Sequence, residues 1–384
     1  MPVANSEPSP SGVTPQVFSH EHPRFEFIAR DARQYRWLLQ ADLYSAALAF
    51  VRGDFDIRGD LIAAIRFKKE TTRGGLRDVL FSMAARLAPK RIESWFQTRL
   101  RAARNIRFHY DRSNDFYRLF LDSRMVYSCA EFRDSGQSLD DAQLNKLDHI
   151  CQKLALRREE RFLDVGCGWG ALVTRAAEEY GAVATGCTLS PQQHWFAAKQ
   201  AIQKNLGNRI AIRECDYRAL QGRFQKIASV GMFEHVGRRR LRQYFRKVFD
   251  LLEDDGLFLN RGIIHPEGTE ADPETLFLQN KVFPGGELVG LSTVTREAER
   301  AGFEVLEVQN LRPHYALTCR RWVERLQKNA VECLRYVDPQ TYRTWLLYLA
   351  GSVVNFEAAS TDVHQILMAK RRPIAPCALR TVNA

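Results

Sequence analysis

The first feature with chemical potential is an acid followed by three closely spaced glycines. Asp164 lies in an apolar stretch, and Gly166, Gly168 and Gly170 follow it at every second position. Glycine has no Cβ, so a turn of this kind brings backbone amides close to a bound molecule. The pattern predicts a buried strand, a tight turn and the start of a helix around a ligand.

The glycine spacing and the acid together indicate which ligand to expect. A dinucleotide-binding turn has the form G-x-G-x-x-G, with an acidic residue about 20 positions later for the ribose. Here the next strand ends in Cys187-Thr188-Leu189-Ser190, which contains no carboxylate. Asp164 would repel a pyrophosphate but attract a sulfonium with an amino-acid tail. We therefore expect the cofactor to be S-adenosylmethionine.

Alternating strand and helix patterns must position this turn. Such alternation predicts an α/β fold with a doubly wound parallel sheet, whose ligand lies beyond the carboxyl ends of the strands. The predicted strands are 161–165, 182–187, 209–214, 226–230, 256–261, 303–308 and 363–369. The predicted helices are 139–156, 171–180, 191–205, 238–252, 315–326 and 342–356.

The carboxyl ends of two further strands carry polar pairs. Asp216 is expected to accept the adenine amino group, and the Tyr217 ring to stack on the base. Glu234 and His235 follow the fourth strand, where a methyl group would be transferred. Such a glutamate often only binds backbone amides at a helix start, but the position above the sheet favours catalysis.

Composition limits the partners and the compartment. The formal net charge of +11 favours an anionic partner, either nucleic acid or a phospholipid surface. No nucleic-acid-binding signature is found, so we expect a lipid surface and no nucleic acid.

None of the eight cysteines forms a C-x-x-C pair, which favours a reducing compartment. No apolar run approaches a membrane span, so a cytoplasmic, peripheral protein is expected. No metal site is predicted.

Four segments are predicted along the chain. Residues 1–20 form a disordered tail, 21–105 a lipid- or membrane-docking module with α+β character, 106–372 the cofactor-binding domain, and 373–384 a second tail. Within the large domain, 268–295 is predicted to cap the site.

Basic residues lie between large apolar residues over 73–107, which fits either a membrane-surface helix or an ordinary linker helix. The aromatic and polar stretch from 108 to 132 suggests a lid.

Several motifs together resemble the cyclopropane-fatty-acyl-phospholipid synthase family, which includes the mycolic acid cyclopropane synthases. The resemblance is strong over 108–370 and weak over the N-terminal module. The motifs are His109-Tyr110-Asp111, Ser113-Asn114-Asp115, Tyr127-Ser128-Cys129-Ala130, Leu163 to Gly170, Thr188-Leu189-Ser190 with Gln193, Asp216-Tyr217-Arg218, Val230 to Gly237, and Phe283-Pro284-Gly285-Gly286.

The resemblance implies a seven-stranded Rossmann-like methyltransferase sheet and a reaction on an unsaturated phospholipid acyl chain. The double bond attacks the sulfonium methyl, and a base removes a proton so that a cyclopropane closes. The implied cofactor contacts are Tyr127, Ser128, Gly166, Gly168, Thr188, Gln193, Asp216 and Tyr217, to which the glycine turn adds Asp164 and Gly170.

The resemblance also implies a bound bicarbonate as the base, and here this chain departs from the family. The matching positions are Cys129, Glu234, Ile263 and Tyr315, but Arg261 replaces the family's histidine. Arginine binds anions well but is no neutral proton acceptor. Two alternatives therefore stay open: a methyltransferase that gives a methyl-branched or methylene lipid or uses another acceptor, and a lipid-binding homologue without turnover. A homodimer is compatible with either.

Overall fold

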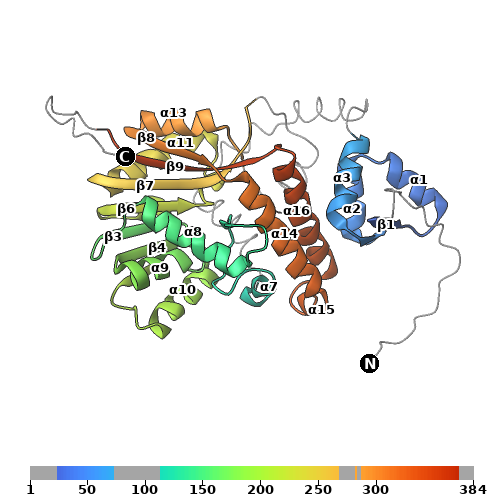
Figure 1. Cartoon of the computed structure of the whole chain (residues 1–384), viewed down its shortest axis with the longest axis horizontal. Coiled ribbons are helices and arrows are strands. Elements are labelled where there is room, and N and C mark those ends of the chain that lie inside the picture. Colours follow the sequence, from blue (N-terminus) through green and yellow to red (C-terminus); the bar gives the residue numbers. More distant parts are fainter. Residues whose placement is uncertain (1–23, 73–112, 268–281, 283–286, 372–384) are drawn as a thin grey trace.

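The computed structural model describes residues 24–72, 113–267, 282 and 287–371. They form a large α/β unit and a small N-terminal module, which packs at one side of the large unit (Figure 1). The predicted tails at 1–20 and 373–384 and the basic stretch at 73–107 lie outside the described residues, as does the Phe283-Pro284-Gly285-Gly286 motif.

The large unit is built on a seven-stranded sheet with the order β5-β4-β3-β6-β7-β9-β8. Its strands are β3 (Arg161–Val165), β4 (Val183–Thr188), β5 (Ile210–Glu214), β6 (Phe224–Val230), β7 (Leu252–Ile264), β8 (Phe303–Asn310) and β9 (Asp362–Lys370). On β3, Asp164 lies beside Gly186 of β4 and Ala228 of β6. The predicted acid therefore occupies an inner strand of the sheet, with small residues on both sides.

The prediction of parallel strands is confirmed for β3 to β7, the strands from which it was drawn. β9 runs antiparallel to both β7 and β8, between which it lies. It starts beside the carboxyl end of β7, because Asp362 pairs with Ile264 there. Since the chain arrives at that end from a preceding helix, the strand runs back along β7.

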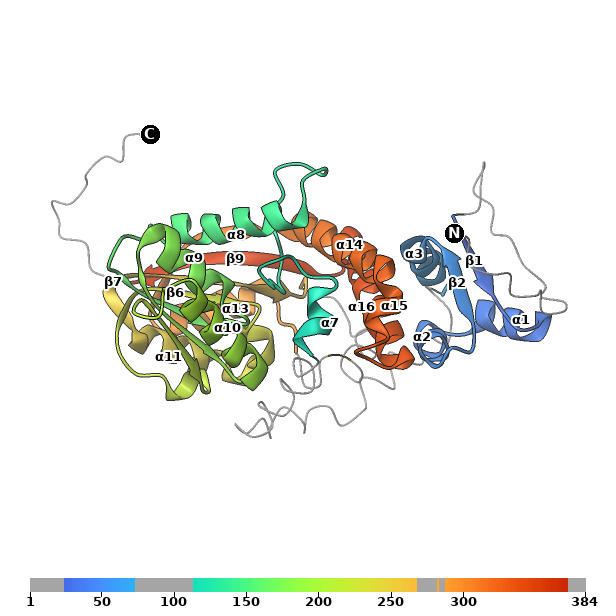
Figure 2. The ribbon, with the colours of Figure 1, turned by 90° about the horizontal axis from the view of Figure 1, so that it is seen from below.

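Helices cover both faces of the sheet (Figures 1 and 2). One face carries α8 (Leu139–Lys153), α9 (Ala171–Tyr180) and α10 (Pro191–Gln203), and the other carries α11 (Leu241–Leu251) and α13 (Leu291–Arg300). Side-chain caps fix the starts of two of them. Ser138 accepts from the Asp141 amide before α8, and Ser190 accepts from the Gln193 amide before α10. Residues 291–295, predicted as part of the cap, form the first turn of α13.

A second core lies beyond the carboxyl ends of the strands. It contains α7 (Asn114–Arg118), α14 (Arg312–Lys328), α15 (Ala330–Cys333) and α16 (Pro339–Glu357). Buried aromatic rings fill the space between these helices, including Phe116, Tyr117, Trp322 and Trp345. The predicted helices 315–326 and 342–356 are thus confirmed, each with longer bounds.

The N-terminal module has α+β character, as predicted. Its hairpin pairs β1 (Phe25–Ile28) with β2 (Asp56–Gly59), and α1 (Ala32–Gln40), α2 (Leu43–Arg52) and α3 (Leu61–Thr72) accompany it. Gly53 ends α2 with φ +78°, a left-handed conformation that glycine adopts without strain. Helices α2 and α3 lie against α16, which therefore contacts both units. No described helix is long and apolar enough to cross a membrane.

Candidate active site

The glycine turn lies at the carboxyl end of β3, as predicted. Gly166, Gly168 and Gly170 all have positive φ angles, of +86°, +53° and +85°. A Cβ on Gly166 would lie 2.8 Å from Met232 Cγ, whereas a Cβ on Gly168 would meet nothing within 4 Å. Gly168 therefore borders open space. Gly170 packs against Ala197 and is not among the pocket-lining residues, so its cofactor contact stays a prediction.

A pocket with an empty volume of about 1230 Å³ opens beyond this turn. Asp164 lines it from below, fully buried, and its Oδ1 has no hydrogen-bond partner. Burial raises the pKa of Asp164 to about 7, and the charge of Lys146 opposes only part of that shift. A buried, unpartnered carboxylate in a cavity fits a cationic ligand, because a ligand charge would offset the cost of burying the carboxylate.

The sequence prediction missed Lys146, which also lines the pocket. Its Nζ donates to Ser128 Oγ at 3.0 Å, and burial together with the charge of Arg261 lowers its pKa to about 8. The signal was present in α8, where Lys146 follows Leu139 and Ala142 at the spacing of the buried face. A lysine on an apolar helical stripe is a reason to look for a buried partner.

The predicted ribose and adenine contacts all line the same pocket. Thr188 donates to Gln193 Oε1 at 2.7 Å, so these two side chains form a buried polar pair. Asp216 is held differently from the expectation, because Arg218 binds both of its carboxylate oxygens, at 2.7 and 2.5 Å. The expected bond from an adenine amino group would therefore share an oxygen that already accepts from arginine. Tyr217 lies edge-on to Tyr244 at the same end.

Tyr127 and Ser128 bring the segment before α8 into the pocket wall, as the lid prediction required. The Tyr127 ring lies 5.1 Å from Trp322 and 5.9 Å from Trp345, and its hydroxyl lies 3.3 Å from that of Tyr348. The pocket therefore borders directly on the aromatic core between α14 and α16. Rings around a cavity without water can stabilise a positive charge on carbon.

Glu234 lies in a short turn after β6, behind the pocket residues Gly231 and His235. Its Oε1 accepts from the Ile263 amide at 2.8 Å, and its buried Oε2 has no partner. Burial raises the pKa of Glu234 to about 7 despite that hydrogen bond. Gly262 makes this approach possible, since a Cβ there would lie 2.8 Å from Glu234 Oε1. Glu234 thus resembles Asp164: buried, half-satisfied and able to titrate near neutrality.

Cys129 and Tyr315 are buried close to Glu234, as the resemblance implied. The Tyr315 ring stacks on Phe356 at 4.7 Å, and the charges of both Cys129 and Glu234 act on its hydroxyl. The Cys129 thiol points toward the carbonyl oxygens of Ala130 and Leu311, at 3.3 and 3.8 Å. Burial raises the pKa of Cys129 to about 12, so this residue remains a neutral thiol.

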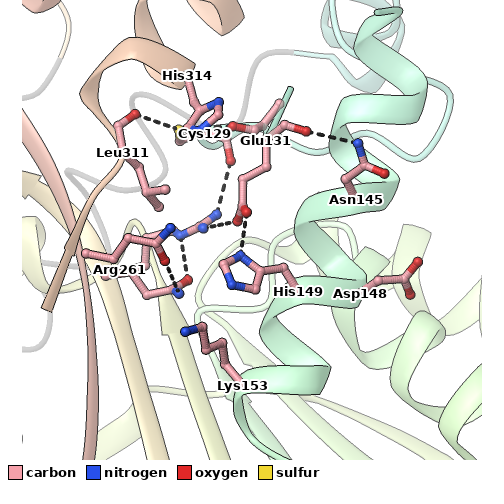
Figure 3. Close-up of polar contacts among 12 residues, drawn as sticks. Cys129, Glu131, Asn145, Asp148, His149, Lys153, Arg261, Leu311 and His314 are labelled. Carbon is pink, nitrogen blue, oxygen red and sulfur yellow. Dashed lines mark hydrogen bonds and ion pairs between the residues drawn. The ribbon is translucent and has the colours of Figure 1, made fainter. Parts of the chain in front are cut away.

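Arg261 lies in a different environment from the one expected for an anion-binding residue. It is 1% exposed on β7, and its guanidinium donates to Gln365 Oε1 at 3.1 Å, to the Cys129 carbonyl at 3.4 Å and to Glu131 (Figure 3). Glu131 also accepts from His149 on α8. Arg261 is therefore paired with a carboxylate that the sequence prediction did not single out.

The charges explain why Glu131 differs from the other two carboxylates. Burial alone would raise its pKa, but the His149 hydrogen bond and the Arg261 charge outweigh burial and lower the pKa to about 2. Asn145 holds the Glu131 backbone carbonyl at 3.1 Å, and His314 accepts from the next amide at 3.2 Å (Figure 3). This network fixes the chain from Cys129 to Phe132 behind the aromatic core.

The sheet and the pocket define the class of protein. A mixed seven-stranded sheet with a glycine turn and a buried acid on an inner strand is the fold of the S-adenosylmethionine-dependent methyltransferases. Coclaurine N-methyltransferase bound to SAH has this fold, with a TM-score of 0.64 at 18% identity over 86% of this chain and all of that one. The pocket fits the cofactor, since Asp164 offers an unpaired carboxylate and Gly168 leaves open space.

Within this class, residues 97–366 match the family model described as mycolic acid cyclopropane synthetase, and the chain belongs to that family. A probable fatty acid methyltransferase of Pseudomonas putida is 38% identical over 91% of this chain and 88% of its own length. The structure of the cyclopropane synthase MmaA2 from Mycobacterium tuberculosis superposes with a TM-score of 0.68 and 31% identity. CmaA1 complexed with SAH and CTAB gives 0.67 and 33%. The chain is thus an S-adenosylmethionine-dependent enzyme.

Proposed function

We propose that the protein transfers a methylene from S-adenosylmethionine to the double bond of an unsaturated fatty acyl chain in a membrane phospholipid, forming a cyclopropane. One observation carries the proposal: the buried Oε2 of Glu234 has no partner, and Glu234 adjoins the pocket residue His235 and acts electrostatically on Tyr315 of the aromatic core. A proton acceptor and aromatic walls are what ring closure through a carbocation requires. The names of the relatives, a fatty acid methyltransferase and cyclopropane synthases, support a lipid substrate.

In this reaction S-adenosylmethionine, when bound, supplies an electrophilic methyl group. The electron pair of the acyl double bond forms a new carbon–carbon bond to that methyl, the methyl–sulfur bond breaks, and a carbocation remains on the acyl chain. Tyr127 lines the pocket, with Trp322 and Trp345 packed against its ring, so this aromatic wall would stabilise the charge and exclude water. Loss of a proton from the transferred methyl then provides the electrons that close the ring.

We propose that Glu234 itself accepts this proton at Oε2. A bicarbonate would need several donors, but two of those at the predicted positions are already engaged: Ile263 donates to Glu234, and Arg261 is paired with Glu131. The Cys129 thiol points at backbone carbonyls. Among the described residues at these positions, the Tyr315 hydroxyl is then the one remaining donor, and a single donor fits bicarbonate poorly. A pKa of about 7 suits Glu234 for proton transfer near neutral pH.

This assignment can be tested with pH and bicarbonate. The carboxylate form is the active one, so kcat should fall as the pH falls through about 7. Removing dissolved CO₂ and bicarbonate from the assay should leave kcat unchanged. A loss of turnover that added bicarbonate restores would show that a bound anion is the base and would contradict the role of Glu234.

A second candidate function is methyl transfer without ring closure. The paired state of Arg261 favours it, because the position of the family's histidine then offers no group to the reaction centre. If a proton leaves a chain carbon instead, the product is a methyl-branched chain that keeps a double bond. If a hydride first shifts to the cationic carbon and the transferred methyl then loses its proton, the product is a methylene chain. Both candidates share the cofactor, the acyl substrate and the carbocation.

We further propose that the enzyme works at the cytoplasmic face of a membrane. The net charge of +11 supports attraction to anionic lipids. Trp37 and Leu39 of α1 support contact with the interface, since both are large apolar side chains about 40% exposed, at 42% and 40%.

The decisive experiment is lipid mass spectrometry on a host rich in monounsaturated phospholipids, grown with methyl-labelled methionine, with and without the protein. A gain of one labelled CH₂ with loss of the olefinic signal is the expected result. The same mass with a retained double bond or a branched methyl would establish the second candidate instead. No labelled lipid would contradict both.

A further inference from the structure

Lys146 is a buried cation in the cofactor pocket that the proposed reaction does not use. It lies on α8, is 2% exposed and lines the pocket. Burial and the charge of Arg261 lower its pKa to about 8, so the ammonium form still dominates at neutral pH. A buried ammonium is costly unless a negative group offsets its charge. A ligand of this pocket is therefore expected to bring a negative group to the lysine.

The hydrogen bonds of Lys146 leave room for such a group. Its Nζ donates to Ser128 Oγ at 3.0 Å, and the other ammonium hydrogens have no partner among the described residues. Asp122 and Asp164 act on its charge, but neither carboxylate hydrogen-bonds to it in this part of the chain. The Asp122 carboxylate instead accepts from two backbone amides, at 2.7 and 3.1 Å. The lysine thus has both charge and donors to offer a ligand.

Asp164 is the counterpart of opposite charge in the same pocket. Its Oδ1 is buried without a hydrogen-bond partner, and the charge of Lys146 opposes the rise in its pKa. The two side chains attract each other, yet no hydrogen bond joins them in the described structure. A ligand that carries a positive and a negative group would compensate both. The amino-acid tail of S-adenosylmethionine carries an ammonium and a carboxylate on the same carbon.

The surroundings hold Lys146 and Ser128 in place. Gln143, one turn before Lys146 on α8, donates to the Ser128 carbonyl at 2.9 Å and to the Val126 carbonyl at 3.3 Å. Met125, which also lines the pocket, has a φ of +59°, a conformation that residues other than glycine seldom adopt. Residues 125–128 are therefore fixed against α8. A carboxylate would find the lysine already in position, so little ordering would be needed on binding.

The place of Lys146 in the pocket fits one end of the cofactor. The predicted ribose and adenine contacts Thr188 and Asp216 lie at the ends of β4 and β5, whereas Asp164 lies on β3 and Lys146 on α8. In the sheet, β4 separates β3 from β5. The amino-acid tail is thus expected on the side of β3 and α8, away from the adenine.

We propose that Lys146 binds the carboxylate of the cofactor's amino-acid tail and makes the pocket selective for a molecule that has this carboxylate. A similar molecule without it leaves a buried ammonium uncompensated, which lowers its affinity. Without the lysine, the carboxylate of the tail would meet the charge of Asp164 in the same buried space. The inference concerns the cofactor alone and does not depend on which lipid product the enzyme forms.

The test measures Kd by calorimetry on the full chain with two probes, S-adenosylmethionine and its decarboxylated analogue, which keeps the sulfonium and the amine. Wild type should bind S-adenosylmethionine roughly 10- to 100-fold more tightly than the analogue. Lys146→Met should lose this preference, because its affinity for S-adenosylmethionine falls by a similar factor while its affinity for the analogue does not fall. Lys153→Met is the matched control on the same helix, since Lys153 pairs with Glu307 at 2.6 Å and is not among the pocket-lining residues.

Each arm of this experiment can contradict the assignment. Wild type that bound both probes equally would overturn it without any variant. Equal losses of affinity for both probes in Lys146→Met would show that the lysine only shapes the pocket through Ser128. Thermal melts without ligand check that the variants fold. If Lys146→Met does not, Lys146→Gln removes the same charge and keeps a polar group beside Ser128, and a wild-type preference there would also refute the proposal. The assay contains no lipid, so its outcome is separate from that of the proposed reaction.

Discussion

Three buried carboxylates divide this molecule into two kinds of region. Asp164 lines the cofactor pocket and Glu234 adjoins the pocket residue His235, each with an unpartnered oxygen and a pKa raised to about 7 by burial. Glu131 is partly buried and paired with Arg261 and His149, and its pKa is lowered to about 2. Burial acts to raise the pKa of all three carboxylates, so pairing accounts for the opposite result at Glu131. An unpaired buried carboxylate marks the place of a ligand or of a proton transfer, and a paired one holds the chain in position.

The largest expected effect comes from Glu234→Gln. The amide keeps the shape and can still accept from the Ile263 amide, but it cannot accept a proton, so kcat should fall by about 10²- to 10⁴-fold. The affinity for S-adenosylmethionine, measured by calorimetry, should stay within about twofold. Glu299→Gln, an exposed change on α13, is the control. A Glu234→Gln enzyme with wild-type turnover would remove Glu234 from the reaction.

Breaking the ion pair between Arg261 and Glu131 should mainly lower the stability of the fold. Arg261→Met leaves Glu131 without its main cationic partner and should lower the free energy of unfolding by about 3–5 kcal/mol in urea titrations. Adding Glu131→Gln to Arg261→Met removes both charges and should recover most of that loss. If the single and double variants were equally unstable, the ion pair would not be the reason for the loss.

Asp164→Asn should weaken cofactor binding but stabilise the ligand-free protein. It removes the negative charge that faces the cofactor, so the Kd for S-adenosylmethionine should rise by roughly 10- to 100-fold. The same change should stabilise the ligand-free protein at pH 8, because the folded pKa of about 7 lies above the ordinary value of 3.8 and the buried charge opposes folding once the proton is lost.

Because the pKa of Asp164 is raised in the folded state, the stability gained by Asp164→Asn should depend on pH. The contribution of Asp164 to stability falls as the pH rises from about 4 to 7, so the advantage of Asp164→Asn should be full above pH 7 and should shrink toward pH 4. Melting temperatures across this range measure it. A stabilisation that did not change with pH would mean that the carboxylate is not the group responsible.

The smallest effect is expected far from all three carboxylates. Trp37→Ser on α1 should weaken sedimentation with phosphatidylglycerol vesicles by about two- to fivefold, with little change in soluble cofactor binding. Tyr336→Ser removes a similarly exposed ring, 42% exposed, outside α1 and serves as its control. Equal losses in both variants would show that exposed rings in general, and not this module, determine binding.

The contrast between the unpaired and the paired carboxylates also explains which site residues could be predicted from the sequence. Asp164, Gly166 and Gly168 could be placed because a strand, a turn and a helix follow one another locally in the chain. Thr188 and Asp216 could be placed because parallel strands bring their carboxyl ends together. The pairing of Arg261 with Glu131 joins residues 130 positions apart in the sequence, and no local pattern contains it. Arg261 was therefore assigned to an anion site, whereas its partner is a carboxylate of the protein itself.

Other differences have similar causes. Gly170 follows the glycine spacing, but only the structure shows that Ala197 occupies the space in front of it. The direction of β9 depends on where α16 ends, which strand patterns do not encode. Lys146 is the exception, because its place on the apolar stripe of α8 was visible in the sequence.

Helix α16 has a consequence for how the protein folds. Arg343 on this helix lies over the Phe50 ring at 4.9 Å and donates to Asp56 at 2.9 Å, and Leu347 packs into the core of the N-terminal module. The N-terminal module and the large unit are therefore packed together through α16. The two parts should unfold in a single transition, and a fragment that starts at residue 113 would expose the apolar side of α16 to water and should aggregate.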